Sequence, residues 1–152
     1  MAFCFAADRT LGTLAKWLRI LGYDTVYESD RSNKSFFDDL ADDRILLTRT
    51  RKIQKKLAAH RTVLITSNYL VNQLKQVVDE IGINPSDIRP FSRCIRCNLA
   101  IAAVKKEDVY GRVPDYIWET HATFNECSLC RRIYWPGTHS IRSMEIISRL
   151  FS

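Results

Sequence analysis

The chain has 152 residues, of which 46% are hydrophobic and 26% are charged, and this composition excludes a disordered or fibrous protein. No run of about 18 apolar residues is present, so we expect no membrane span. The apolar start at 1–7 lacks the basic region of a signal peptide, which leads us to expect a cytoplasmic protein. The net charge of +6 permits a nucleic-acid partner, although a solvated basic surface has the same composition.

The first ninety residues alternate between short apolar runs and helical patterns. Strands are expected at 3–7, 25–27, 45–48 and 63–66. Helices are expected at 11–21, 36–41, 53–58 and 70–81. Gly22 and Gly82 supply two of the helix ends, and Ser32 or Asn33 is a suitable cap for the second helix. Four apolar strands that are each followed by a helix predict an α/β fold with a parallel sheet covered on both faces.

Acidic residues follow the first two predicted strands. Asp8 comes after the first strand, and Glu28 and Asp30 come after the second. Ligands of parallel sheets bind beyond the carboxyl ends of the strands, and neighbouring carboxylates there favour a divalent cation such as Mg²⁺. Asp is also common in loops and helix caps, so a purely structural role for Asp8 and Asp30 is the alternative.

A basic cluster follows the third strand and consists of Arg49, Arg51, Lys52, Lys55 and Lys56. On a helix, Lys52 and Lys56 are four residues apart and share a face. Such a cluster favours binding to a phosphate backbone, and a solvated helix face is the alternative.

Two cysteine pairs mark the last sixty residues. The pairs Cys94-x-x-Cys97 and Cys127-x-x-Cys130 are separated by 29 residues. Four thiolates in two such pairs bind Zn²⁺ tetrahedrally and form a closed, structural site. A redox motif needs only one pair, and the expected location makes disulfides unfavourable. The apolar spacing in 141–151 predicts a final helix that packs back on the body.

Several motifs together resemble one known family. The segments that carry the resemblance are 8–12, 14–19, 21–25, 45–49, 93–97, 112–114 and 134–139, together with Cys127 and Cys130. They are similar to the C-terminal ribonuclease-like domain of Mut-seven-type exonucleases. The resemblance implies a PIN-like nuclease domain at 1–88 and a zinc-ribbon module with a C-terminal helix at 89–152.

The resemblance also implies metal-dependent hydrolysis of RNA, with Mg²⁺ or Mn²⁺ held by acidic residues. Asp8 matches the first acid and Asp30 a second, whereas two further acidic positions of the family are Thr50 and Asn68 here. The helix expected at 36–41 adds Asp38 and Asp39 as further candidates. Arg49, Lys52 and Lys56 are the expected RNA contacts.

Two classes of protein follow from this pattern. The first is a metal-dependent ribonuclease, slowed by the absence of the two acids. The second is a non-catalytic RNA-binding protein on the same scaffold.

Overall fold

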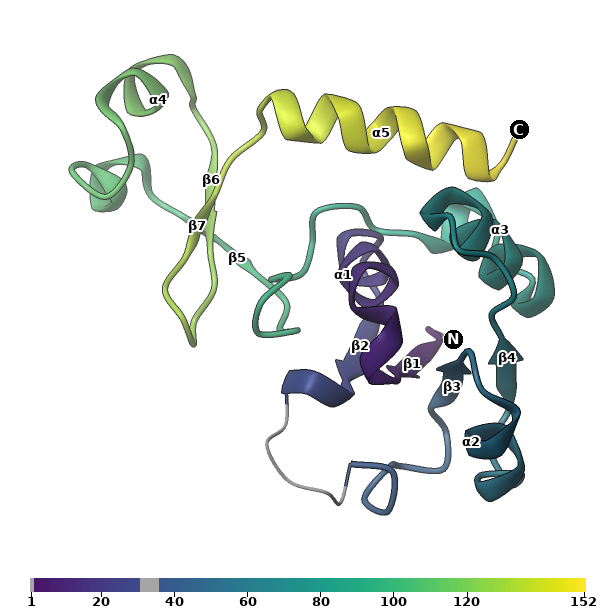
Figure 1. The fold of residues 1–152 in the computed structure, drawn as a ribbon. Helices are drawn as coiled ribbons and strands as arrows, with labels where there is room; N and C mark the ends of the chain where they lie inside the picture. Colours follow the sequence, from purple (N-terminus) through teal and green to yellow (C-terminus); the bar gives the residue numbers. More distant parts are fainter. Residues whose placement is uncertain (1, 31–35) are drawn as a thin grey trace.

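The computed structural model describes residues 2–30 and 36–152 and contains a four-stranded parallel sheet with flanking helices (Figure 1). Its strands are β1 (Cys4–Ala7), β2 (Asp24–Tyr27), β3 (Ile45–Thr48) and β4 (Thr62–Leu64). Their order is β2-β1-β3-β4 and every pairing is parallel. The α/β fold expected from the sequence is therefore confirmed.

In the described residues, the α-helices of this sheet unit are α1 (Gly12–Ile20), α2 (Arg51–Lys56) and α3 (Leu70–Ile81). The helix expected at 36–41 is wrong, because 36–39 form turns and 40–41 have no regular structure. Its proposed caps, Ser32 and Asn33, lie outside the described residues. Four aspartates, at 38, 39, 42 and 43, favour turns here, and Phe36 is buried without a helix.

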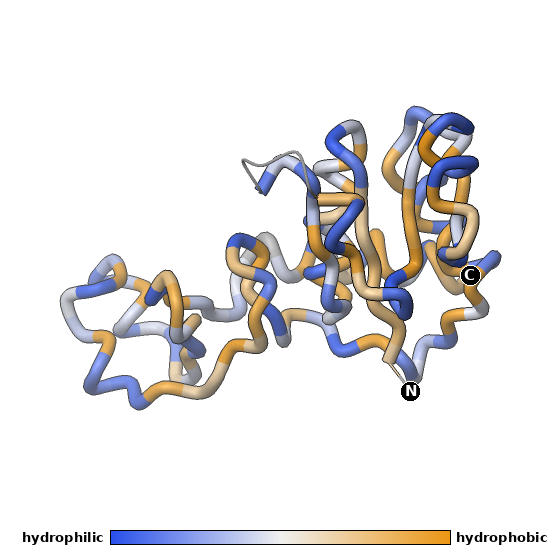
Figure 2. Tube along the Cα trace, turned by 90° about the horizontal axis from the view of Figure 1, so that it is seen from below, coloured by the Kyte–Doolittle hydropathy of each residue, from blue (hydrophilic) through white to orange (hydrophobic). Residues whose placement is uncertain are grey.

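The strands bury side chains on both faces, as a parallel sheet requires. Alternate strand residues such as Phe5, Leu47 and Val63 form one core with α1 and α3. Ala6 and Leu46 point to the other face and are also fully buried. Figure 2 shows the hydrophobic strands gathered in the interior of this unit.

The second half contains a smaller antiparallel sheet. Its strands are β5 (Ala102–Val104), β6 (Phe124–Glu126) and β7 (Ile133–Tyr134), in the order β5-β6-β7. Helix α4 (Asp115–Thr120) lies between β5 and β6, within the 29 residues that separate the cysteine pairs. Val109, Val113, Ile117 and Phe124 form a second core, separate from the first.

Helix α5 (Thr138–Leu150) returns from the small sheet to the large one (Figure 1). Ile147 and Leu150 are buried in the first core, where α5 packs against α3. This packing agrees with the expectation for the final helix. The segment 89–91, which leads from the first half to the second, is held against the end of α1, because the N–H groups of Arg89 and Phe91 donate to the carbonyls of Leu21 and Ile20 at 2.9 Å each. No helix in the described part of the chain is long and apolar enough to cross a membrane.

Candidate zinc centre and candidate active site

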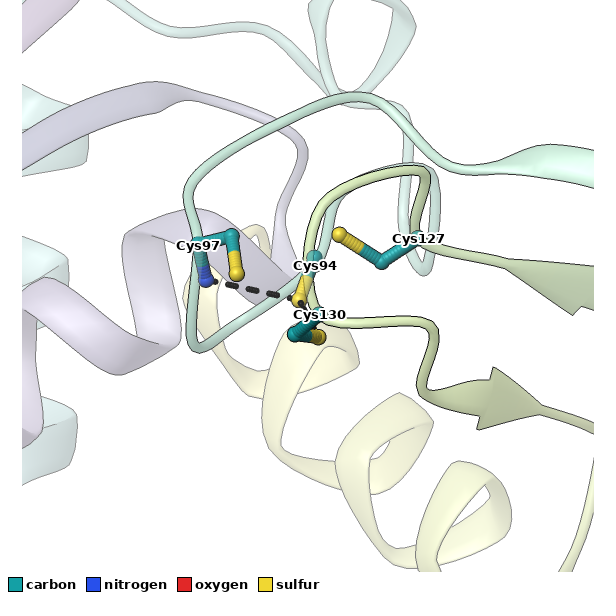
Figure 3. A group of neighbouring side chains, drawn as sticks. All are labelled: Cys94, Cys97, Cys127 and Cys130. Atoms are coloured by element: carbon teal, nitrogen blue, oxygen red, sulfur yellow. Dashed lines mark hydrogen bonds between the residues drawn. The ribbon is translucent and has the colours of Figure 1, made fainter.

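Cys94, Cys97, Cys127 and Cys130 converge on one point (Figure 3), and their sulfur atoms all lie within 4.8 Å of one another. The Sγ atoms of Cys94 and Cys130 are 3.8 Å apart, which is about the edge of a tetrahedron with Zn–S bonds of about 2.3 Å. Cys94 and Cys127 are fully buried. Spacing, donor type and geometry therefore fit a structural zinc ion.

Each cysteine pair lies on a tight loop of the same design. The residue after the second cysteine, Asn98 or Arg131, has a positive φ of 61° or 66°. Its N–H donates to the carbonyl of the first cysteine, at 2.9 Å in both loops. The N–H of the first cysteine in turn donates to the carbonyl of the next residue along the loop, which is Leu99 in the first loop and Arg132 in the second. The two loops are thus matched knuckles that face each other across the metal position.

The pKa values of two of the thiols, Cys94 and Cys97, shift in opposite directions. Burial raises the pKa of Cys94, but hydrogen bonds from the Tyr134 hydroxyl, at 3.0 Å, and from backbone N–H groups outweigh it and lower the pKa to about 7. Burial and the sulfur atoms of Cys130 and Cys127 raise the pKa of Cys97 to about 12. One thiolate is therefore favoured without metal, and a cation is needed to stabilise all four.

Asp8 lies at the carboxyl end of β1, where the order of the strands reverses. The chain runs from β1 out to β2 and then crosses to β3 on the other side of β1. Asp8 and Thr48 follow the paired residues Ala7 and Leu47, and the Thr48 hydroxyl donates to Asp8 Oδ2 at 2.6 Å. Open parallel sheets bind their ligands at such a reversal.

Asp8 is 1% exposed, and its carboxylate caps the turn that leads into α1. Its Oδ1 accepts hydrogen bonds from the N–H and the hydroxyl of Thr10, at 2.8 and 2.5 Å. A carboxylate has about four lone-pair sites, and these three bonds occupy three of them. Asp8 is therefore held rigidly and keeps one acceptor site.

The two positions where the family resemblance implies acids lie at the same edge of the sheet. The Thr50 hydroxyl is 3.5 Å from that of Thr48, so Thr50 is one side chain removed from Asp8. Thr50 also caps α2, accepting from the N–H of Ile53 at 3.4 Å. Asn68 accepts a hydrogen bond from the guanidinium of Arg49.

Asp30 is tied to a buried arginine. Arg19 Nη2 donates to Asp30 Oδ2 at 2.9 Å, and the two side chains are 7% and 48% exposed. The same guanidinium donates to the carbonyls of Thr25 and Ile95, at 2.9 and 2.8 Å. Arg19 therefore joins β2, the first zinc knuckle and Asp30, and sequence reasoning did not single out this role.

Glu28 is another contact that the sequence did not reveal. Its two oxygens accept from the N–H and the guanidinium of Arg9, at 2.9 and 3.0 Å. Arg9 directly follows Asp8, and its side chain is 73% exposed. Glu28, at the end of β2, thus holds the loop that contains Asp8 in place.

The basic cluster is presented by α2 and the residues before it. Arg51, Lys52, Lys55 and Lys56 are exposed, and no ion pair found within 2–30 and 36–152 involves them. Their charge is therefore available to a polyanion.

One group of three or more Cys, His, Asp or Glu side chains in the described ranges is close enough to share a metal ion, and it is the four-cysteine cluster. Asp8 and Asp30 do not belong to such a group among these residues. Asp38 and Asp39 are exposed in the turn at 36–39. Any cation at the sheet edge therefore relies on fewer carboxylates than the zinc centre has thiolates.

The fold and the four-cysteine cluster define an α/β protein with an attached four-cysteine module. Comparison with protein families matches residues 4–147 to the Mut7-C RNAse domain. The chain therefore belongs to the Mut7-C RNAse domain family, and this membership indicates a ribonuclease-type function. The same comparisons give no match among curated proteins and none among solved structures.

Proposed function

We propose that the protein is a divalent-metal-dependent ribonuclease with Asp8 as its catalytic carboxylate. The observation that carries this proposal is the position of Asp8, buried at the carboxyl end of β1 and hydrogen-bonded to Thr48 at the end of β3. This is the place on a parallel sheet where ligands bind, and family membership supports RNA as the substrate.

The proposal needs two carboxylates to share a weakly held ion. Asp8 has one remaining acceptor site, and Asp30, which follows β2, would have to bring its Oδ1 to the same ion, because its Oδ2 is bound to Arg19. Thr50 and Asn68 add neutral oxygens. When bound, Mg²⁺ or Mn²⁺ supplies an activated water and stabilises the leaving oxygen. Two carboxylates neutralise the ion less well than a set of three or four, so we expect slow catalysis.

RNA is bound in this proposal by Arg49, Lys52 and Lys56. Arg49 lies at the end of β3, next to Thr48, and α2 begins two residues later. The phosphates of a bound strand therefore approach the same edge of the sheet as Asp8.

The alternative is a non-catalytic RNA-binding protein. The observation that favours it is the presence of Thr50 and Asn68 where the family resemblance implies acids. Both side chains also have structural partners, Ile53 and Arg49.

A cleavage assay on end-labelled RNA, with and without Mn²⁺, separates the two proposals. Asp8→Asn keeps the turn capped, since Asn is as good a cap as Asp, and removes the charge that holds the metal. We expect cleavage that requires Mn²⁺ and is lost in Asp8→Asn. Asp87→Asn is the matched control, because Asp87 is an exposed acid that caps a turn elsewhere through a 2.8 Å bond to the N–H of Asn84.

Zinc content is measured for each variant, so that loss of the structural ion is not mistaken for loss of the catalytic one. Equal cleavage by wild type and Asp8→Asn contradicts the catalytic proposal. Binding of RNA without cleavage by the wild type favours the alternative.

A further inference from the structure

Tyr69 is an exposed aromatic residue at the edge of the sheet that carries Asp8. It lies between β4 and α3, and it is 74% exposed, the most exposed large hydrophobic side chain in the described part of the chain. A single exposed tyrosine needs no explanation. Its neighbours give this one a functional context.

The backbone that presents Tyr69 is fixed by three hydrogen bonds. The Tyr69 N–H donates to Ser67 Oγ at 3.0 Å, and the Tyr69 carbonyl accepts from the N–H of Gln73 at 2.9 Å. The buried side chain of Gln73 donates to the Ser67 carbonyl at 2.9 Å. The backbone at Tyr69 is therefore held at a defined position before any partner arrives, which lowers the entropic cost of binding there.

Positive charge lies near the segment that presents Tyr69. Asn68, the preceding residue, accepts from the guanidinium of Arg49, which directly follows β3. Arg49 begins the basic cluster, which continues along α2. An exposed aromatic ring and positive charge at the same edge of a sheet are the combination that binds single-stranded nucleic acid, because phosphates bind to the charge and bases stack on the ring.

The spacing along the sheet edge links Tyr69 to the candidate active site. β1, β3 and β4 are adjacent, so Asp8 and the end of β4 are two strand spacings apart, roughly 10 Å. Stacked nucleotides advance by about 3.4 Å each. Tyr69 lies five residues beyond Leu64, the last residue of β4, so a single strand of several nucleotides is long enough to join a phosphate near Asp8 to a base on Tyr69.

From these contacts we infer that Tyr69 is a base-stacking platform and that the substrate is single-stranded RNA. This inference rests on the proposed function and specifies its substrate class. In a duplex the bases are stacked on each other and their faces are covered, so a stacking platform selects against it. Stacking tolerates every base, and little sequence preference is expected at this position.

The experiment measures binding of a fluorescently labelled single-stranded RNA of mixed sequence to the zinc-loaded protein, in the Asp8→Asn background and without Mn²⁺. Tyr69→Ala should weaken binding roughly 5- to 100-fold, as loss of one stacked base does, and Tyr69→Phe should retain it. Tyr116→Ala is the matched control, because Tyr116 is 66% exposed on α4, in the smaller sheet unit. When the same strand is annealed to its complement, the duplex should bind with equal affinity to the proteins with and without the Tyr69→Ala substitution.

Stacking releases no counterions, so Tyr69→Ala should leave the salt dependence of binding unchanged. Equal affinity of the Asp8→Asn protein with and without Tyr69→Ala for the single strand overturns the inference. An equal loss of duplex binding also overturns it, since a general surface contact then explains the effect. The proposed ribonuclease activity is judged separately, by Mn²⁺-dependent cleavage, so either idea can fail alone.

Discussion

Thr50 is separated from Asp8 only by the Thr48 hydroxyl, and it also caps α2. Asp is as good a helix cap as Thr, so Thr50→Asp keeps the helix start and adds a carboxylate beside the proposed metal position. We expect higher Mn²⁺-dependent cleavage, because the added charge holds the ion more tightly. Without metal, the melting temperature should fall, because like charges at the sheet edge repel each other.

Thr120→Asp adds the same charge on α4 and serves as the control for Thr50→Asp. Combining Thr50→Asp with Asp8→Asn should remove the gain in cleavage. If the wild type cleaves RNA well and Thr50→Asp shows the same dependence of cleavage on Mn²⁺, the metal ligands lie elsewhere.

Arg19 and Asp30 allow a second test at single residues. Arg19 satisfies two backbone carbonyls and one carboxylate, and lysine cannot reach all three in this geometry. Arg19→Lys should therefore lower the free energy of unfolding by roughly 2–4 kcal/mol, measured in urea. Asp30→Asn should cost less than about 1 kcal/mol, because the Asp30 side chain is 48% exposed.

The Mn²⁺ concentration needed for half-maximal cleavage then separates two roles of Asp30. If Asp30 also holds the metal, Asp30→Asn raises this concentration while stability changes little. An unchanged Mn²⁺ requirement leaves Asp30 as a partner of Arg19 alone.

Residues that act through long-range contacts could not be read from the sequence. The Arg19 guanidinium meets the carbonyl of Ile95, 76 positions away, and the Asn98 side chain meets the N–H of Thr25, 73 positions away. No local pattern marks such pairs. The cysteine pairs were readable because their spacing and chemistry are specific to one kind of site.

At the scale of elements, strands and long helices were predicted well from periodicity. The last helix of the sheet unit was expected at 70–81 and spans Leu70–Ile81. The expected helix at 36–41 is wrong because the aspartates at 38, 39, 42 and 43 favour turns. Phe36 and Phe37 contact each other edge to face within such a turn, with their ring centroids 5.0 Å apart. Two adjacent aromatic residues produce the same apolar pattern in a turn as in a helix, so the pattern alone does not distinguish the two structures.

The first zinc knuckle also covers the free edge of β2. The Asn98 side chain accepts from the N–H of Thr25 at 2.9 Å and donates to Asp24 Oδ1 at 2.7 Å. We expect zinc removal or Cys127→Ser to unfold the small sheet and to lower the stability of the large one as well, because this edge loses its cover.

Tryptophan fluorescence measures the effect of zinc loss, because Trp118 and Trp135 pack against the second core and Trp17 packs against the first. Zinc release should shift the emission of the tryptophans in the second core to longer wavelength. The sheet unit should then unfold at a lower urea concentration than in the zinc-bound protein. Cys4→Ser is the control, since Cys4 lies outside the four-cysteine cluster. Full retention of the emission spectrum in zinc-free protein would contradict a structural zinc ion.

The net charge of the whole molecule sets its affinity for a polyanion. Four thiolates and one Zn²⁺ together contribute −2, so the formal charge of +6 becomes about +4 in the zinc-bound protein. Binding to single-stranded RNA should weaken as salt rises, with a slope of about 0.7 per neutralised phosphate in logarithmic terms. Replacing Lys52 and Lys56 by Gln should lower that slope by about 1.4.

The matched control for this measurement replaces Lys105 and Arg142 by Gln, two exposed charges of the second half. The total charge then falls by the same amount as in the Lys52 and Lys56 variant, and the slope of affinity against salt should stay close to that of the wild type. Equal slopes for both double variants would show that RNA is attracted by net charge and not by α2.

The place of α5 in the first core has a consequence for the order of synthesis. Ile147 and Leu150 close a core whose other members end at Ile83. On the ribosome, the surface of α3 that receives them stays uncovered while the whole zinc module is translated. The nascent sheet unit therefore exposes an apolar face until α5 emerges, and an exposed apolar face of this kind makes a nascent chain prone to aggregation during this interval.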